Sequence, residues 1–212
     1  STFYGTTYTS EQPAYTNEKI YYSKVQYEAS PLNRVLTTMA SGNSWAGNNK
    51  GVQQQYLVND GNDLVRAWDI TYTLLTYTNN DVTTNIPKSI ATYAAGQLSE
   101  TVSIDEHNNQ VIEYNDNQGH TVHKKVQIGT VTNAAPYTNW LCTFYVYDDL
   151  GRLRFVIPPK AVAQMISARN WTLTSTLINE LCFRYEYDDR QRMIAKKVPG
   201  AGWVYMVYDQ ND

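Results

Sequence analysis

Hydrophobic and polar residues alternate with a period of two along much of this 212-residue chain. That period is typical of half-buried β-strands, because successive side chains of a strand point to opposite faces. Turn-forming stretches such as "NDGND" and "DEHNN" separate these segments. We therefore predict strands in "KIYYSKVQYEA", "GVQQQYLVN", "LVRAWDITYTLLTYT", "KSIATYAAGQLSETVSID", "QVIEYND" and "HTVHKKVQI".

The C-terminal third of the chain contains an internal repeat. Leu141–Pro159 aligns with Leu181–Pro199 without a gap, and the two share Leu, Cys, two Tyr, two Asp, Arg and Pro. Weaker copies surround Tyr114 and Tyr27, and Tyr208-Asp209 opens a further unit. Repeats of this period indicate a stacked architecture rather than a compact enzyme core, so we expect the chain to be a piece of a longer protein.

Each repeat is predicted to be a β-hairpin whose motif residues build the turn. An Asp at the turn can accept a backbone N–H, and a Gly three residues later supplies a positive φ. The second copy has Gln191 where the first has Gly151, which predicts either a strained residue or a turn of another shape. The structural motif residues are Tyr145, Tyr147, Asp148, Gly151, Arg152, Tyr185, Tyr187, Asp188 and Arg192.

The two tyrosines of each motif are expected to share one face of the sheet. Stacked repeats would then align their rings into a ladder of cross-strand aromatic pairs. Arg152 lies just past the turn, where it can bond the carboxylates of Asp148 and Asp149 or lie against a tyrosine ring. The same two alternatives apply to Arg192 in the second copy.

Apolar residues switch to helical spacing after Pro158-Pro159. The segment "KAVAQMISARNW" predicts one short helix, and "STLINELCFRY" predicts a second with Ser175 as its N-cap. The fold class is therefore mainly β: antiparallel hairpin repeats in a curved sheet, with a helical insertion near 160–182. We divide the chain into a β-rich segment, 1–140, and hairpins with the insertion, 141–212; one continuous sheet is the alternative.

Composition narrows the function classes. Tyrosine is abundant at 18 residues, charged residues make up 17% and the net charge is −3, which gives no basic footprint for nucleic acid. No apolar run reaches the length of a membrane helix, and the chain does not open with a signal peptide. This composition is typical of a β-rich extracellular or surface protein.

No catalytic, cofactor-binding or metal-binding residues are predicted. His120 and His123 are three positions apart on a predicted strand and so face opposite sides, while His107 lies in a polar turn. The paired aspartates are explained by the turns. Cys142 and Cys182 occupy equivalent repeat positions and are interpreted as small buried residues, with a disulfide between them as the alternative.

The motifs Tyr147-Asp148-x-x-Gly151-Arg152 and Tyr187-Asp188-x-x-x-Arg192 resemble the YD repeat of Rhs proteins. The segments "YYSKVQYEASPLNRVL", "YAAGQLSETVSIDEHNN" and "YVYDDLGRLRFVIPPKA" extend the resemblance to the long Rhs-type proteins of Bacteroides-like bacteria, upstream of the Rhs core. The resemblance implies a non-enzymatic strip of an encapsulating β-shell. In relatives of that family, which are secreted or lie on the bacterial cell surface, the shell encloses a C-terminal polymorphic toxin domain or serves as a large adhesin-like body. The partners implied are the remainder of its own chain and, in the first case, the enclosed toxin domain. The self-cleaving core motif of that family is not in this sequence.

A glycan-binding surface module is the alternative function. Trp45, Trp68, Trp140, Trp171 and Trp203, with the many tyrosines, could form a flat platform for sugars. The competing interpretation is that these rings provide core and cross-strand packing, which hairpin repeats need in quantity.

Overall fold

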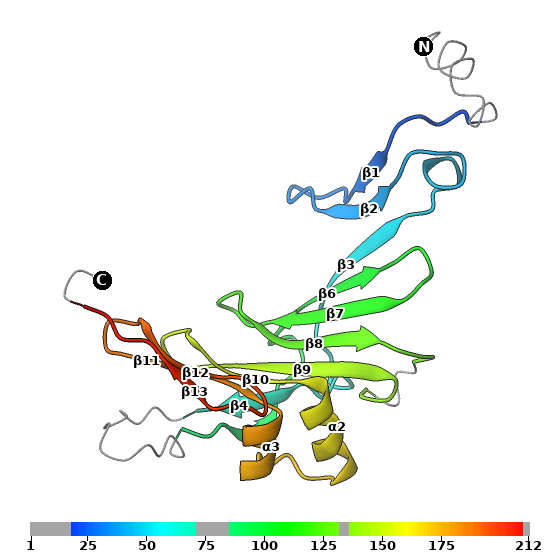
Figure 1. Cartoon of the computed structure of the whole chain (residues 1–212). Coiled ribbons are helices and arrows are strands. Elements are labelled where there is room, and N and C mark those ends of the chain that lie inside the picture. Colours follow the sequence, from blue (N-terminus) through cyan, green and yellow to red (C-terminus); the bar gives the residue numbers. More distant parts are fainter. Residues whose placement is uncertain (1–17, 71–84, 132–135, 210–212) are drawn as a thin grey trace. The chain divides into compact units, whose positions relative to one another are not determined.

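The computed structural model describes residues 18–70, 85–131 and 136–209. It divides into two compact units, one made of residues 1–57 with 101–111 and the other of 58–100 with 112–212. The parts of the predicted strand "LVRAWDITYTLLTYT" that follow Ile70 lie outside the described residues. The ends of the chain and its elements are labelled in Figure 1.

The protein is mainly β, as predicted. Among the described residues, eleven strands form one antiparallel sheet in the order β1-β2-β3-β6-β7-β8-β9-β10-β11-β12-β13. Its strands are β1 (Lys24–Tyr27), β2 (Val35–Met39), β3 (Val52–Val58), β6 (Ser99–Ile104), β7 (Gln110–Asn115), β8 (Thr121–Gln127), β9 (Trp140–Tyr147), β10 (Leu153–Ile157), β11 (Phe183–Tyr187), β12 (Met193–Lys197) and β13 (Trp203–Tyr205). A separate pair is formed by β4 (Arg66–Asp69) and β5 (Lys88–Thr92).

In the first unit, the β1–β2 hairpin leads through a short 3-10 turn, η3 (Ala46–Asn48), into β3. The buried apolar residues between β1 and β3 are Met39 and Ala46. Gly51 enters β3 so close to β2 that a Cβ there would lie 2.2 Å from the carbonyl oxygen of Thr38. Only glycine permits this approach of the two backbones.

In the second unit, the sheet buries one face. Cys142, Phe144 and Val146 of β9 are buried, whereas the alternating Tyr145 and Tyr147 are half-buried on the opposite face. The predicted boundary between residues 140 and 141 falls at the start of β9, and β9 pairs with β8 from His123↔Phe144 to Gln127↔Trp140.

Strand β4 covers part of that buried face. The Trp68 ring meets the Phe144 ring edge-on, with 6.0 Å between the centroids. The centroid of the Trp171 ring lies 6.5 Å from that of Trp68 and 5.9 Å from that of Phe144. Such edge-to-face contacts add to the free energy gained by burying the rings. All five tryptophans are partly buried, and none is exposed. Two of them, Trp68 and Trp171, pack against the buried ring of Phe144, which supports the packing interpretation over a tryptophan platform.

The helical insertion between β10 and β11 is present (Figure 1). It consists of α2 (Pro159–Ser167) and α3 (Ser175–Glu180). Helix α2 begins with a proline, whose missing N–H costs nothing in the first turn, and it buries Ala161, Val162 and Met165. The N-cap of α3 was predicted one residue too late: Thr174 is the cap, and its hydroxyl accepts the Leu177 N–H at 3.3 Å.

Two basic residues of β8 are buried among aromatic rings. His123 lies between Tyr114 and Phe144, with ring centroids 5.7 and 4.0 Å away, and its Nδ1 is 3.0 Å from the Thr143 carbonyl oxygen. Lys125 places its ammonium 5.5–6.0 Å from the rings of Tyr114, Tyr137 and Trp140. Desolvation lowers the pKa of His123 to about 3, with a smaller contribution from Lys125.

His123 should make folding pH-dependent. Its pKa is about 3 in the folded state and about 6.5 when unfolded, so the unfolded state binds an extra proton between these values. Stability is therefore complete above pH 6.5 and is lost as the pH falls toward 3. Between pH 7 and 5 we expect wild type to lose about 2 kcal/mol more than His123→Phe, measured by urea unfolding. Equal losses in the two proteins would contradict a neutral, buried imidazole.

Candidate functional site

The turn between β9 and β10 is built around the carboxylate of Asp148. The backbone N–H of Asp148 donates to the Arg152 carbonyl at 3.0 Å, and the Gly151 N–H donates to the Asp148 carbonyl at 2.8 Å. The Asp148 Oδ1 accepts the backbone N–H groups of Leu150 and Arg152, at 3.1 and 3.0 Å. The other oxygen accepts Nε of Arg152 at 2.9 Å. One side chain thus satisfies two turn amides and fixes the arginine.

The β11–β12 turn repeats this arrangement. Asp188 Oδ1 accepts the backbone N–H groups of Arg190 and Arg192, both at 2.9 Å, and Oδ2 accepts Arg192 Nε at 2.9 Å. Gln191 has φ +63°, close to the +71° of Gly151. The two turns therefore have the same shape, and Gln191 is the strained residue that the first sequence alternative predicted.

The same use of a turn carboxylate recurs at three further hairpins. The Asp116 carboxylate is hydrogen-bonded to the backbone and ring nitrogens of His120. The Asp105 carboxylate accepts hydrogen bonds from the backbone and side-chain amide nitrogens of Asn109. Glu28 accepts Nε of Arg34 at 2.9 Å across a longer turn. Sequence comparison indicated the turns near Tyr114 and Tyr27. The stretch "DEHNN" was predicted as a turn but not as a copy of this motif, because it has neither tyrosine nor arginine and Asn108, with φ +65°, takes the glycine position.

The arginine also contacts the tyrosine of the next hairpin. Arg152 lies 5.3 Å from the Tyr187 ring centroid, and the Tyr187 hydroxyl donates to the Leu153 carbonyl at 3.0 Å. In the next copy, Arg192 lies 4.5 Å from the ring of Tyr208, which donates to the Met193 carbonyl at 2.7 Å. From the sequence, a carboxylate and a tyrosine ring were alternative partners for Arg152. In the structure its side chain contacts both, the Asp148 carboxylate and the Tyr187 ring.

The first unit contains the same contact. Arg34 lies 4.3 Å from the Tyr56 ring centroid, and the Tyr56 hydroxyl donates to the Val35 carbonyl at 3.0 Å. In all three copies the accepting carbonyl belongs to the residue directly after the arginine. We call this set, consisting of the turn carboxylate, the arginine and the tyrosine of a neighbouring hairpin, the hairpin clamp.

A β-bulge accompanies each clamp. The pairing register shifts between Leu153 and Phe155, between Gln26 and Tyr27, and between Glu186 and Tyr187. Each shift inserts one residue two positions after the clamp arginine: Leu36, Arg154 or Ile194. A bulge sends two neighbouring side chains toward one face, and accordingly Arg154 and Phe155 are both buried.

The two tyrosines of a repeat share one face of the sheet, as expected, but their rings do not pair with tyrosines of the next repeat in the way the ladder predicted. Tyr145 and Tyr147 do share a face, opposite the buried one. Within the described part of the chain, however, no ring contact joins Tyr147 to Tyr187. Tyr147 stacks on His120 at 4.5 Å, and Tyr187 lies against Arg152. A cation or imidazole thus separates successive tyrosines.

Buried charges extend from the Asp148 turn into the interior. Arg154, which is 1% exposed, bonds Glu186, donates to the Tyr185 carbonyl at 3.0 Å and contacts Asp148 at 3.3 Å. Burial alone would raise the pKa of Asp148, but the bonds from Arg152 and Arg154 outweigh it and the pKa is lowered. For Glu186 burial prevails, and its pKa is raised. This network joins two hairpins by desolvated ion pairs.

The remaining candidates for chemistry were also located. Cys142 and Cys182 are free and buried, and burial raises the pKa of both thiols to about 12, so neither is a thiolate at neutral pH. Among the described residues, no three His, Cys, Asp or Glu side chains are grouped to hold a metal. The helices in that part of the chain are too short and too polar to cross a membrane.

Comparison with protein families matches the N-terminal part of the chain. Residues 1–58 match a family described as a domain of unknown function, DUF6443. The match ends near the division between the two units and leaves the hairpins around Asp148 and Asp188 unmatched. No curated protein matches the chain.

Replacing Gly151 tests the turn geometry. Gly151→Val should destabilise the protein by about 2 kcal/mol or more, because a β-branched residue resists positive φ. In addition, its Cβ would lie 3.0 Å from the His120 ring. Gln191→Gly, at the equivalent position, should be neutral or stabilising by up to about 1 kcal/mol. Thermal unfolding of both variants checks this, and an unchanged Gly151→Val melting temperature would refute the turn.

The clamp hydroxyl can be removed alone. Tyr187→Phe should cost about 1 kcal/mol, because the ring stays against Arg152 while the Leu153 carbonyl loses its donor. Tyr185→Phe is the matched control, since Tyr185 lies on the same strand face and its hydroxyl makes no hydrogen bond within the described residues. Chemical unfolding of the two variants should separate them. Equal stabilities would show that the hydroxyl contact contributes nothing.

Proposed function

We propose that this chain is a non-enzymatic structural segment of a secreted or surface Rhs/YD-repeat protein. In this proposal its sheet is one strip of a β-shell that encloses a C-terminal toxin domain carried by the same longer protein. The observation that carries the proposal is the hairpin clamp, because it recurs at Arg34, Arg152 and Arg192 with the same contacts.

The clamp supports a structural role for a chemical reason. Its carboxylate is occupied by turn amides and an arginine, its arginine by a carboxylate and a ring, and its tyrosine hydroxyl by a carbonyl. A catalytic group must instead have an available proton or lone pair at a position that a substrate reaches. Each clamp group is committed to joining one hairpin to the next, which is what an extended repeat sheet requires.

The buried ion pairs between β10 and β11 also support a structural role. Removing one partner of a desolvated pair typically costs several kcal/mol, because the other charge is left buried. Arg154 therefore fixes Glu186 and the Asp148 turn relative to one another. Such a network stabilises the pairing of one particular hairpin with its neighbour, and a shell requires its hairpins to be arranged in a fixed order.

Electron microscopy of the natural polypeptide that carries this chain tests the proposal. The expected result is a hollow body whose wall contains these hairpins, with density for a further domain inside. A solid globular particle, or an extended filament without an interior, would overturn the shell. Arg154→Met serves as an internal check, since the wall is expected to lose order locally around β10 and β11 while distant hairpins remain.

A further inference from the structure

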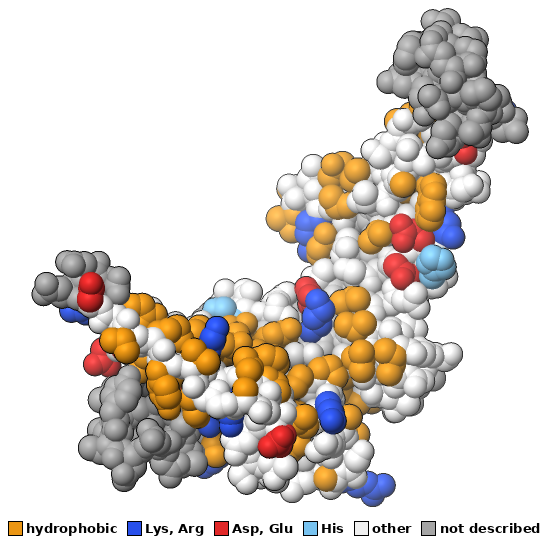
Figure 2. Space-filling view, in the orientation of Figure 1, with side chains coloured by type: hydrophobic (Ala, Val, Ile, Leu, Met, Phe, Trp, Pro, Cys, Tyr) orange, Lys and Arg blue, Asp and Glu red, His pale blue; other side chains and the backbone are white. Residues whose placement is uncertain are grey.

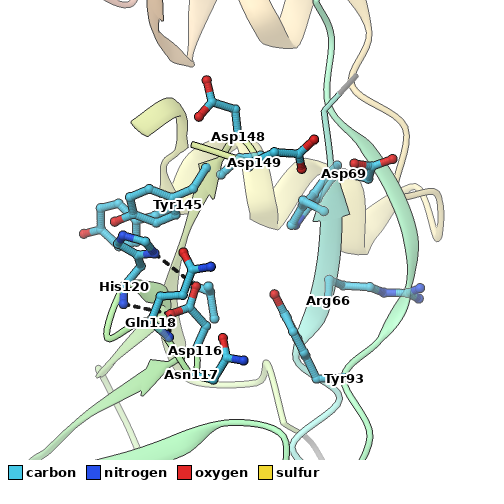
Figure 3. A pocket seen from close by; sticks show the side chains of 14 residues that line it. Arg66, Asp69, Tyr93, Asp116, Asn117, Gln118, His120, Tyr145, Asp148 and Asp149 are labelled. Atoms are coloured by element: carbon cyan, nitrogen blue, oxygen red, sulfur yellow. Dashed lines mark hydrogen bonds and ion pairs between the residues drawn. The ribbon is translucent and has the colours of Figure 1, made fainter. Parts of the chain in front are cut away.

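The second unit contains a polar cavity that the structural role does not use. It has a volume of about 220 Å³ and lies between the Asp116 turn, the end of β9 and strand β4. Figure 3 shows the Tyr93 hydroxyl pointing into it from one side and the Gln118 side chain facing it from another. The residues that face it with uncommitted polar groups are Asp69, Tyr93, Asn117, Gln118, Tyr145 and Asp149.

Other lining residues are already engaged, except that the buried Nε1 of Trp68 has no hydrogen-bond partner among the described residues. Asp116 pairs with His120 at 3.2 Å, and Asp148 is bonded by Arg152 and Arg154. The Arg66 guanidinium lies 4.8 Å from the Trp171 ring centroid and points away from the cavity in Figure 3. In contrast, Asp69 and Asp149 are exposed and form no ion pair with another described residue.

We propose that this cavity binds one ring of a neutral sugar. The carboxylates repel phosphates, sulfates and acidic sugars, and the polar lining offers little to an apolar ligand. Planar carboxylates and amides can each meet two neighbouring hydroxyl groups, and tyrosine rings offer a flat apolar face to a pyranose. The volume is below the range of about 300–1,000 Å³ typical of drug-sized ligands, which suits a single ring.

The proposal assigns separate roles to the lining groups. Asp149 and Asp69 accept hydrogen bonds from ring hydroxyls, and the Gln118 and Asn117 amides both donate and accept. The Tyr93 hydroxyl has no hydrogen-bond partner among the described residues, and desolvation raises its pKa, so it stays a neutral donor at physiological pH. This site is independent of the shell, because none of these six residues belongs to a hairpin clamp.

The test is a titration of the ¹⁵N-labelled chain followed by NMR. The probes are the methyl glycosides of glucose, galactose, mannose and N-acetylglucosamine. For at least one probe we expect shifts confined to amides near residues 93, 117–118 and 149, with a Kd of about 1–10 mM, as for a single ring with few contacts. Asp149→Asn and Tyr93→Phe should each raise that Kd about five- to tenfold, because the first replaces a charged acceptor oxygen with an amide NH2 and the second removes a hydroxyl.

Asp189→Asn is the matched control. Asp189 holds the same motif position in the next turn and is exposed, but it does not line the cavity. Its Kd should stay within about twofold of wild type. Shifts that are absent with all four glycosides, or that survive Asp149→Asn unchanged, would overturn the proposal. So would methylguanidinium shifting the same amides while no glycoside does, because the cavity would then be a cation site. None of these outcomes affects the shell, which rests on the clamp.

Discussion

The hydrogen bonds from two turn amides to one aspartate oxygen are the contact on which the repeated hairpins depend. They set the turn, and the turn places the arginine so that its Nε reaches the second oxygen of the same carboxylate. Held there, the guanidinium lies against a tyrosine ring from the neighbouring hairpin. Local turn chemistry is thereby converted into a contact between hairpins. Removing the carboxylate would take away the acceptor of two turn amides and of Arg152 Nε, although the guanidinium also donates to the Asp188 carbonyl at 3.3 Å.

The chemistry of the clamp explains which substitutions its positions accept. A histidine can replace the arginine, because an imidazole also bonds the turn carboxylate and stacks on the next ring, as His120 does with Tyr147. Gln191 can replace glycine at the cost of a positive φ. Lysine would be a poorer substitute, since an ammonium lacks the planar fork with which a guanidinium bonds a carboxylate and lies flat on a ring. The turn carboxylate itself is present in all five turns of this kind in the described chain, as Asp or as Glu28.

Much of the fold was predictable because its signals are local. The period-two pattern identified strands, Pro158-Pro159 located the helices, and Gly151 indicated the turn. The bulges were not predictable, because an inserted residue such as Arg154 looks like any outward polar position until its pairing is known. Burial of His123 and Lys125 was missed for a related reason. A strand face is known to be buried only when its cover is known, and part of that cover here is β4, which is distant in the sequence.

The two neighbouring aspartates of each repeat differ in what they contact. The first, Asp148 or Asp188, is committed to its turn and to an arginine, so its replacement would disturb the hairpin. The second, Asp149 or Asp189, is exposed and makes no bond that the turn needs. Such a position can change at little cost in folding free energy, and its surroundings differ between hairpins. Asp149 borders the cavity together with β4 and the Asp116 turn, whereas Asp189 is not among the residues that line it. A repeat of this kind can therefore acquire a binding site at one turn while every turn keeps the same architecture.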